Sequence, residues 1–416
     1  MTSFLTLTPV PELLAHIASF APLEAEDVPL EEGAGRTLAE DFRSPEELPG
    51  FDRSVVDGFA VRARDVFGAG EGMPALLSCL GEIPMGAVPT ITVMPGTCVR
   101  IWTGGMLPQG ADAVVMLEYV RQVADPDSAD VELTRPVAPG DNVLAKDEDC
   151  GLGETLIPGG RLLRPQEVGL LAGLGQERVR VRRRPKVAVI STGDEVIPYG
   201  RRPLPGQVRD VNAVTLAALA REEGGEARFF GLVGDDEATL KRLVGEAFAW
   251  GDVVLVSGGS SAGRRDYTLN ALAAVPGCST LIHGVAVSPG KPLIFARSGE
   301  KSCWGMPGHV ASALVCAHVF LRPLLRRLLG RDDGNRIEHV VSARMTRPVP
   351  SVLGRRDYIR VALGRPLEPG DAPTAIPVLG KSGAISTLVK ADGLVVCLET
   401  DEGIPAGTLV EVEPLR

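Results

Sequence analysis

Residues 252–266, DVVLVSGGSSAGRRD, combine an apolar run with a Ser/Gly loop that ends at an aspartate. The run of Val and Leu predicts a buried parallel strand. Glycines beyond a strand allow backbone angles that turn successive N–H groups toward one side, which suits a phosphate or another oxyanion. The loop supplies three such glycines and three hydroxyl donors, namely Gly258, Gly259, Gly263, Ser257, Ser260 and Ser261. The stretch indicates either an anion-binding loop or a tight turn between a strand and a helix.

Two more loops carry compatible chemistry, at residues 191–195 (STGDE) and 305–309 (GMPGH). Because the carboxyl ends of parallel strands meet at one edge of a sheet, the three loops are expected to lie together there. Glycine and serine would donate to phosphate oxygens, and carboxylates could hold Mg²⁺ or a polar substrate ring. The candidate carboxylates are Asp194, Glu195, Asp235, Asp236 and Asp266. Taken singly, such a residue is more often part of a turn or a helix cap, as Asp235 could be for the helix that follows it.

The elements that would position these loops belong to an α/β domain. From Lys186 onward, short apolar runs alternate with helical patterns, which predicts a parallel sheet with right-handed crossovers. Ligands of such sheets bind beyond the carboxyl ends of the strands. The predicted strands are VAVIS (187–191), ARFFGLV (227–233), VVLVS (253–257) and PLIF (292–295), and the predicted helices span 210–223, 237–250 and 309–329, with another that begins at Asp266.

Outside the α/β domain, two helical patterns at 11–21 and 166–174 flank a region rich in glycine and proline. Short alternating segments in that region, such as 89–101 and 113–120, predict strands, and DPDSAD at 125–130 predicts a hairpin turn. The alternating run RVRVRRRPK at 178–186 favours an exposed strand that leads to a hinge over a patch that binds nucleic acid.

The sequence therefore predicts a multidomain protein of the α/β plus β class. A discontinuous elongated domain would comprise residues 1–44 and 147–184, and an inserted β-rich domain would comprise residues 45–146. The parallel α/β domain would span 185–331, followed by a C-terminal β domain at 332–416. Four domains agree with the usual size of about 100 to 200 residues for each domain.

Composition excludes several classes of function. A formal net charge of -10 over 416 residues argues against a general nucleic-acid-binding protein. The seven cysteines form no CxxC pair and no zinc-site spacing, which indicates reduced thiols and a cytoplasmic protein. The N-terminus lacks the basic segment of a signal peptide, and no run of about 18 apolar residues predicts a membrane span.

Nine stretches, in order across nearly the whole chain, resemble the molybdopterin molybdenumtransferase family, which includes the E domain of gephyrin. They are SVVDGFAVR (54–62), RIWTGGMLPQGADAVVMLE (100–118), RRPKVAVISTGDEV (183–196), PGQVRDVN (205–212), GLVGDDEATL (231–240), VSGGSSAGRRDYT (256–268), SPGKP (288–292), MPGHVASA (306–313) and LGRRDYIRV (353–361). The fold that the resemblance implies has a MogA-like α/β molybdopterin-binding domain and a C-terminal domain that resembles a β-barrel.

The resemblance implies an enzyme of molybdenum cofactor biosynthesis. Members of this family take adenylylated molybdopterin, bind molybdate and, with Mg²⁺, cleave the pyrophosphate link so that molybdenum joins the pterin dithiolate and AMP leaves. Such a reaction needs donors for phosphate, a metal ion that neutralises the charge at the pyrophosphate, and a separate oxyanion pocket. The resemblance also implies an elongated homodimer with a site shared between subunits, and contact with other proteins of the pathway.

Site residues follow by position from the residue types and the resemblance together. The catalytic set is Asp57, Thr103, Glu195, Asp235 and Asp266, of which Asp57 and Thr103 lie in the inserted domain that faces the partner subunit in this family. The set that binds the pterin and its phosphates is Thr192, Gly193, Asp194, Ser257, Gly258, Gly259, Ser260, Gly263, Lys291, Pro307 and Gly308. The molybdate set is Lys291, Arg355, Arg356 and Ser386, and the metal set is Asp235, Asp236 and Asp266.

Four positions depart from the family pattern. Ser288 replaces the first lysine of the usual Lys-Pro-Gly-Lys-Pro, and His309 and Val310 replace the last two residues of the usual Pro-Gly-Asn-Pro. Arg264 stands where an acidic residue is common, and it could supply the positive charge lost at Ser288. The leading hypothesis is molybdate insertion into adenylylated molybdopterin. The alternatives are a molybdopterin-binding paralogue, either non-catalytic or of altered specificity, and a molybdopterin adenylyltransferase.

Overall fold

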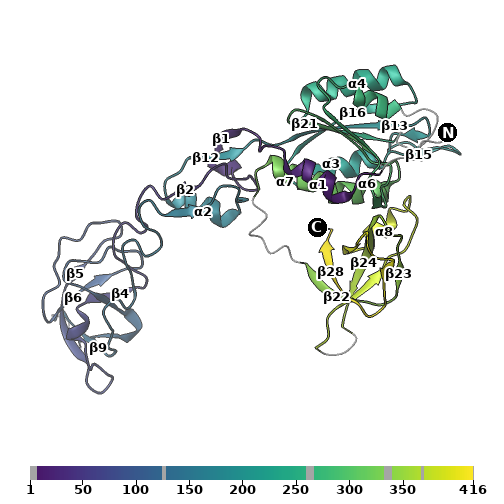
Figure 1. Cartoon of the computed structure of the whole chain (residues 1–416). Coiled ribbons are helices and arrows are strands. Elements are labelled where there is room, and N and C mark those ends of the chain that lie inside the picture. The colour runs from purple at the N-terminus through teal and green to yellow at the C-terminus, as the bar shows by residue number, and fades with distance from the viewer. Residues whose placement is uncertain (1–6, 124–127, 259–266, 332–339, 367–369, 416) are drawn as a thin grey trace. The chain divides into compact units, whose positions relative to one another are not determined.

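A computed structural model of the chain describes residues 7–123, 128–258, 267–331, 340–366 and 370–415. Contacts within the chain divide it into two compact units (Figure 1). The first unit comprises Met1–Glu40, Gly159–Arg164 and Arg178–Arg416, and the second comprises Asp41–Pro158 and Pro165–Glu177. No helix in the described part is both long and apolar enough to cross a membrane. All seven cysteines are free thiols.

A six-stranded sheet forms the centre of the first unit. Its strand order is β16 (Glu226–Val233), β13 (Lys186–Thr192), β17 (Val253–Ser257), β21 (Lys301–Met306), β20 (Ile294–Ser298) and β18 (Thr280–His283). The first four strands are parallel. Three of them, β16, β13 and β17, are the strands predicted at 227–233, 187–191 and 253–257, whereas β21 was not predicted. The strand predicted at 292–295 is β20, which runs antiparallel to both neighbours. Only two residues separate β20 from β21, and so short a connection joins antiparallel strands.

Helices cover both faces of this sheet, as Figure 1 shows. Alternate residues of β13 and β17, such as Val189 and Leu255, pack on one face with α1 (Val10–Ala18), α3 (Asn212–Glu222), α6 (Val310–Cys316) and α7 (Arg322–Leu328). The intervening residues, such as Ile190 and Val254, pack on the other face with α4 (Glu237–Trp250) and α5 (Tyr267–Ala273). Burial on both faces explains why these strands are continuously apolar in sequence.

The predicted helices are present, with shifted ends. The helix predicted at 309–329 consists of α6, a π-helical turn at Ala317–Leu321, and α7. The helix predicted to begin at Asp266 is described from Tyr267, because residues 259–266 lie outside the described part. The α4 bounds match the prediction because an aspartate precedes its first residue and a glycine follows its last.

The C-terminal domain is a closed five-stranded β-barrel, which confirms the predicted β-barrel-like fold. Its strands pair in the order β24 (Arg356–Gly364), β25 (Thr374–Pro377), β22 (Val341–Met345), β28 (Leu409–Pro414) and β26 (Gly393–Cys397), and β26 pairs back with β24. The interior contains Ala343, Val361, Val395 and Val412. A strand of the α/β domain, β19 (Val287–Ser288), pairs in parallel with the start of β24. The short strands β23 (Val349–Pro350) and β27 (Gly403–Ile404) pair beside the barrel.

The arginine-rich segment forms β12 (Arg178–Arg182), which pairs antiparallel with β1 (Ala25–Pro29). Val179 and Val181 are buried, while Arg178 and Arg180 are exposed. Arg180 forms an ion pair with Asp27 on the neighbouring strand. The expected exposed strand is thus present at this position.

The second unit is β-rich, as predicted. Its six-stranded sheet has the order β7 (Ala113–Met116), β4 (Gly58–Val61), β6 (Thr97–Ile101), β5 (Ala75–Glu82), β9 (Asp130–Leu133) and β8 (Val120–Gln122). Short pairs join β2 (Phe42–Arg43) to β11 (Thr155–Ile157) and β3 (Arg53–Ser54) to β10 (Val143–Leu144), and α2 (Pro165–Gly173) is the predicted helix.

Two strand predictions in this unit were too long. The strand predicted at 89–101 begins only at Thr97, because Pro95 and Gly96 form a turn. Proline also has no N–H group to donate to the hydrogen bonds between strands. The strand predicted at 113–120 is broken by a 3₁₀ turn at Leu117–Tyr119. The hairpin predicted at 125–130 joins the antiparallel strands β8 and β9, but residues 124–127 lie outside the described part. The boundaries of the four domains remain a prediction.

Candidate functional site

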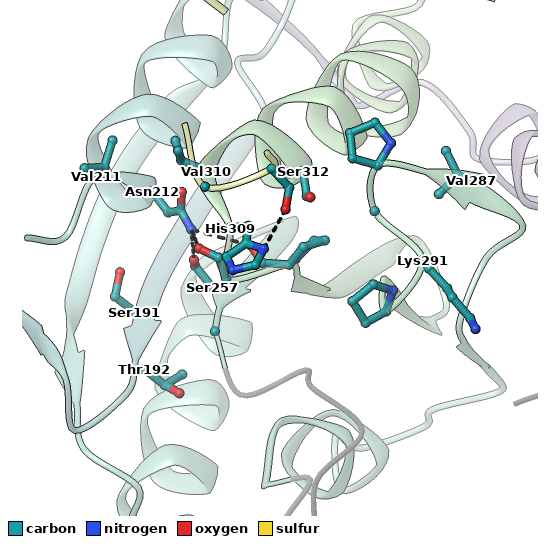
Figure 2. Close-up of a pocket in the computed structure, with 18 of the residues that line it drawn as sticks. Ser191, Thr192, Val211, Asn212, Ser257, Val287, Lys291, His309, Val310 and Ser312 are labelled. Atoms are coloured by element: carbon teal, nitrogen blue, oxygen red, sulfur yellow. Dashed lines mark hydrogen bonds between the residues drawn. The ribbon is translucent and has the colours of Figure 1, made fainter. Parts of the chain in front are cut away.

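A pocket of about 830 Å³ lies at the carboxyl ends of β13, β17 and β21 (Figure 2). The three loops singled out in the sequence all contribute to it, as expected. Their lining residues are Ser191, Thr192, Glu195, Ser257, Gly258, Pro307, Gly308 and His309. The turn before α3 also lines the pocket, and so do the segment around β19 and three residues of the barrel domain, Arg355, Ser382 and Gly383.

The floor of the pocket is polar because the apolar alternation of two strands ends there. Ser191 on β13 and Ser257 on β17 are partners in the strand register. Each follows the buried apolar residue of its strand, Val189 or Leu255, by two residues and therefore lies on the same face of the sheet. Both serines are buried, with 2% and 4% of their surface exposed. Asn212, the first residue of α3, donates from Nδ2 to Ser257 Oγ at 2.7 Å and to the Gly308 carbonyl oxygen at 2.9 Å.

Gly258 lets two of the loops approach each other closely. Its φ angle is 99°, and a Cβ atom there would lie 2.3 Å from the carbonyl oxygen of Thr192. Any other residue would therefore push the β17 loop away from the β13 loop. Gly193 likewise has a φ of 136°, and a Cβ atom there would lie 2.8 Å from Glu195 Oε2. Gly259, Ser260, Gly263, Arg264 and Asp266 lie outside the described residues.

The carboxylates near β13 and β16 have structural roles in this arrangement. Asp194 Oδ1 accepts a hydrogen bond from the Asp235 backbone N–H at 2.9 Å. Asp236, and not Asp235, caps α4, because its side chain accepts from the N–H groups of Ala238 and Thr239. The hydrogen bond from the Thr239 hydroxyl holds the pKa of Asp236 below its ordinary value. Asp194, Asp235 and Asp236 do not line the pocket, whereas Glu195 does.

Within residues 7–123, 128–258, 267–331, 340–366 and 370–415, no group of three or more His, Cys, Asp or Glu residues is arranged to hold a metal ion.

The four residues of the predicted molybdate set divide into two pairs. Lys291 and Arg355 line the pocket, and Lys291 is exposed. Arg356 instead makes a two-pronged ion pair with Glu399, with Nε 2.9 Å from Oε2 and Nη2 3.1 Å from Oε1. Consecutive residues at the start of a strand point to opposite sides, which separates the two arginines. Ser386 is exposed at the start of α8 (Ser386–Val389) and does not line the pocket.

Arg355 is partly engaged by its own strand. Its Nε lies 2.9 Å from Asp357 Oδ1, and its Nη2 donates to Asp357 Oδ2 at 3.2 Å. The Arg355 side chain is still 40% exposed, so part of the guanidinium faces open space. Within the described part of the chain no ion pair involves Lys291, which leaves its ammonium group available to an anion.

Three of the four departures from the family pattern, Ser288, His309 and Val310, line the pocket. His309 Nδ1 lies 2.7 Å from Ser382 Oγ, and the Ala311 N–H donates to the Ser382 carbonyl oxygen at 3.0 Å. Ser382 therefore joins the barrel domain to the start of α6. The imidazole of His309 stands over the pocket in Figure 2.

Sequence reasoning did not single out Asn212, Ser312 and Ser382, which also line the pocket. The signal for Asn212 is a polar residue at the first position of a helix whose buried face is otherwise apolar. Ser312 is similarly a buried hydroxyl on the otherwise apolar α6. Ser382 carries no local signal, because it reaches the pocket through long-range contacts with His309 and Ala311 at the start of α6.

Asp57 and Thr103 meet in the second unit. Asp57 Oδ1 accepts hydrogen bonds from the Thr103 backbone N–H at 2.8 Å and from its hydroxyl at 2.7 Å. The backbone bond from Thr103 is the main reason that the pKa of Asp57 lies below its ordinary value. The two residues come together because Asp57 precedes β4 and Thr103 follows β6, and these strands are paired. The pocket belongs to the first unit.

Family models match three successive regions of the chain. They are the MoeA N-terminal region (domain I and II) at residues 8–175, a probable molybdopterin binding domain at 188–327, and the MoeA C-terminal region (domain IV) at 342–415. The three matches together extend over most of the sequence in one order.

Individual relatives agree with these matches. The molybdopterin molybdenumtransferase of Nostoc sp. is 37% identical over 314 residues, which are 75% of this chain and 71% of that protein. The Bacillus subtilis protein of the same name is 31% identical over 415 residues, covering 99% of this chain and 95% of that protein. A crystal structure of a molybdopterin biosynthesis MoeA protein from Pyrococcus horikoshii has a TM-score of 0.80 at 37% identity and covers 99% of this chain and 100% of that chain. The chain belongs to the molybdopterin molybdenumtransferase family.

Proposed function

We propose that this protein inserts molybdate into adenylylated molybdopterin and releases AMP, as a step of molybdenum cofactor biosynthesis. The observation that carries the proposal is the single pocket where three Gly/Ser loops of the α/β domain meet Lys291 and Arg355. The names of the relatives from Nostoc and Bacillus support the same reaction.

The pocket offers different chemistry at its floor and at its barrel side. The floor has neutral donors and acceptors in Ser191, Ser257 and Asn212, which suit a polar ring such as a pterin. The barrel side has Lys291 and Arg355, whose N–H donors and positive charges suit a tetrahedral dianion. In the proposed reaction water attacks the phosphoanhydride bond and AMP leaves, while the two pterin thiols replace two oxygen atoms of molybdate, which depart as water together with the thiol protons and further protons from solvent. The protein contributes binding, orientation and charge stabilisation.

Mg²⁺ is part of the proposal. In the predicted metal set, Asp235 and Asp236 do not line the pocket and Asp266 lies outside the described residues. This ion is usually held by one or two carboxylates together with substrate phosphates, so no cluster of three protein ligands is needed. Asp236 is occupied as a helix cap, which leaves Asp235 and Asp266 as the proposed ligands. When bound, the ion would neutralise charge at the pyrophosphate. Removing it with a chelator should stop AMP release and leave the fold unchanged.

A homodimer with a shared site is the second part of the proposal. Asp57 and Thr103 belong to the unit that does not contain the pocket, and we propose that they complete the pocket of a second copy. The Asp57 carboxylate is held in one orientation by two hydrogen bonds from Thr103, which suits a residue that must act at a fixed place. Seven free thiols support a cytoplasmic location. Contact with other proteins of the pathway is a further part of the proposal.

A molybdopterin-binding paralogue with no transferase activity, or with altered specificity, is the second candidate. The observation in its favour is that Ser288, His309 and Val310 all line the pocket and all depart from the family pattern. One experiment separates the candidates. Purified protein is incubated with adenylylated molybdopterin, molybdate and Mg²⁺, and AMP and mature cofactor are measured. Tight pterin binding without AMP would support the paralogue, whereas consumption of ATP with free molybdopterin would support an adenylyltransferase.

A further inference from the structure

The hydroxyl group of Ser191 is buried on the pocket floor without a hydrogen-bond partner in the described part of the chain. Only 2% of the residue is exposed. Buried hydroxyl groups are normally paired, because an unpaired one has lost its hydrogen bonds to water and gained none. An unpaired hydroxyl that lines a pocket therefore points to a group that the pocket binds.

Ser257 lies beside Ser191, and its hydroxyl group accepts a hydrogen bond but donates none to the described residues. Its Oγ accepts the hydrogen bond from Asn212 Nδ2, and no acceptor for its hydroxyl proton is present among the described residues. The orientation of Asn212 is fixed, since its Nδ2 faces the Gly308 carbonyl oxygen at 2.9 Å and that oxygen cannot donate. Ser257 is thus held as a donor toward the pocket (Figure 2).

The two serines lie side by side on the same face of adjacent strands, so one bound atom can be offered to both hydroxyl groups. Ser191 and Ser257 are register partners on adjacent parallel strands, which lie about 4.8 Å apart in any sheet. Within the described part of the chain no hydrogen bond joins the two hydroxyl groups, in agreement with the unpaired state of Ser191. A single oxygen atom at about 2.8 Å from each hydroxyl would bridge them.

We propose that Ser191 and Ser257 together bind the ring carbonyl oxygen of the pterin. This inference rests on the proposed function. Two converging O–H donors select an acceptor. A neutral carbonyl suits the floor better than a phosphate, because both serines are nearly inaccessible and burying a charged group there requires a cation. The pocket's cations include Lys291 and Arg355, which lie on the segment around β19 and in the barrel domain rather than on these two strands.

The test uses full-length protein and two ring compounds. One of them lacks the ring carbonyl oxygen and, with it, the hydrogen on the neighbouring ring nitrogen, so the inference is read from the change in preference that Ser191→Ala causes. Pterin carries the ring carbonyl, and 2-aminopteridine has hydrogen in its place. Fluorescence titration should show that the wild-type protein binds pterin about tenfold more tightly than 2-aminopteridine, as two neutral hydrogen bonds allow. In Ser191→Ala this preference should fall to about threefold, because only the bond from Ser257 remains.

Thermal unfolding supplies the control. Ser191→Ala should keep or raise the melting temperature, since the deleted hydroxyl has no partner. The matched variant is Ser302→Ala. Ser302 lies at the amino end of β21, away from the pocket, and its hydroxyl accepts a hydrogen bond from Trp304 Nε1 at 3.0 Å. This change should lower the melting temperature and keep the preference for pterin.

Each contrary outcome has its own meaning. An unchanged preference in Ser191→Ala would overturn the inference and leave the proposed function intact. Loss of inorganic phosphate binding in Ser191→Ala, with pterin binding unchanged, would assign the pair to a phosphate and also overturn the inference. Failure of the wild-type protein to bind either ring compound would contradict the pterin site of the proposed function itself.

Discussion

Two adjacent arginines in the barrel domain have different surroundings. Arg355 lines the pocket and is 40% exposed, whereas Arg356 is held by both oxygens of Glu399 and does not line the pocket. The sequence places the two residues together and cannot separate them. Strand alternation separates them in the structure, because neighbouring side chains on a strand face opposite sides.

This difference predicts unequal effects on molybdate use. Arg355→Ala should raise the KM for molybdate about tenfold or more, because a hydrogen bond to a charged group contributes about 1.5–3 kcal/mol. Arg356→Ala should change this KM less than about threefold, and should lower stability by about 1 kcal/mol because Glu399 loses its partner. The rate of AMP release against molybdate concentration measures the first effect, and urea unfolding measures the second. Equal KM changes in both variants would mean that Arg356 leaves Glu399 to bind the anion.

Residue types alone predicted the polar loops but could not assign every carboxylate. Asp235 and Asp236 are equivalent candidates in sequence, and only the backbone geometry shows that Asp236 caps α4. Ser191 was predicted only as part of a loop. Its unpaired hydroxyl depends on where β17 and α3 lie, which is long-range information that residue spacing does not contain.

At the scale of elements, Asp252 connects three segments of the α/β domain. The residue directly precedes β17, and its carboxylate accepts from Arg183 at 2.7 and 2.8 Å and from the Lys186 backbone N–H at 2.8 Å. Burial raises the pKa of Asp252, but the hydrogen bonds from Arg183 and Lys186 outweigh it, so the pKa lies below its ordinary value. The ionised form is therefore favoured in the folded protein.

Asp252→Asn should consequently destabilise the protein by about 3 kcal/mol at pH 7, as loss of one partner of a mostly buried ion pair does. The contribution of the wild-type carboxylate is fully present above the unfolded pKa of about 3.9 and is lost as the pH falls through the lower folded pKa. The variant should therefore show a flatter decline in stability below pH 4, measured by urea unfolding. Glu246→Gln, which removes an exposed ion pair on α4, should change stability by less than about 0.5 kcal/mol. A loss of similar size in both variants would contradict the role of Asp252.

Helices and strands whose residues carry a clear cap or apolar pattern were predicted well, whereas the direction of β20 was not. The bounds of α4 follow from its cap and its periodicity, and the burial of β13 and β17 follows from their apolar runs. The antiparallel direction of β20 was missed because hydrophobic pattern is the same in both directions. The two residues that connect it to β21, Gly299 and Glu300, were the available signal.

At the scale of the whole molecule, the proposed homodimer makes a prediction about mixed variants. When present in every copy, Asp57→Ala should abolish transferase activity, and Lys291→Ala should do so at a molybdate concentration that is too low for that variant to bind. In a dimer with shared sites, a mixed pair would have one site with both changes and one site with neither. Coexpression of the two variants should therefore restore about a quarter of wild-type activity, since about half of the dimers are mixed. Light scattering should give twice the mass of one chain. No recovery in the mixture would mean that each copy builds its own complete site.

The most direct test of the proposed function is the dependence of AMP release on molybdate. Purified protein with adenylylated molybdopterin and Mg²⁺ should release one AMP for each mature cofactor formed, and only after molybdate is added. Lys291→Ala should bind the pterin but need a higher molybdate concentration, because the pocket loses a cation that forms no ion pair with any described residue. AMP release at the same rate without molybdate, or pterin binding with no AMP at any molybdate concentration, would contradict the proposed transferase.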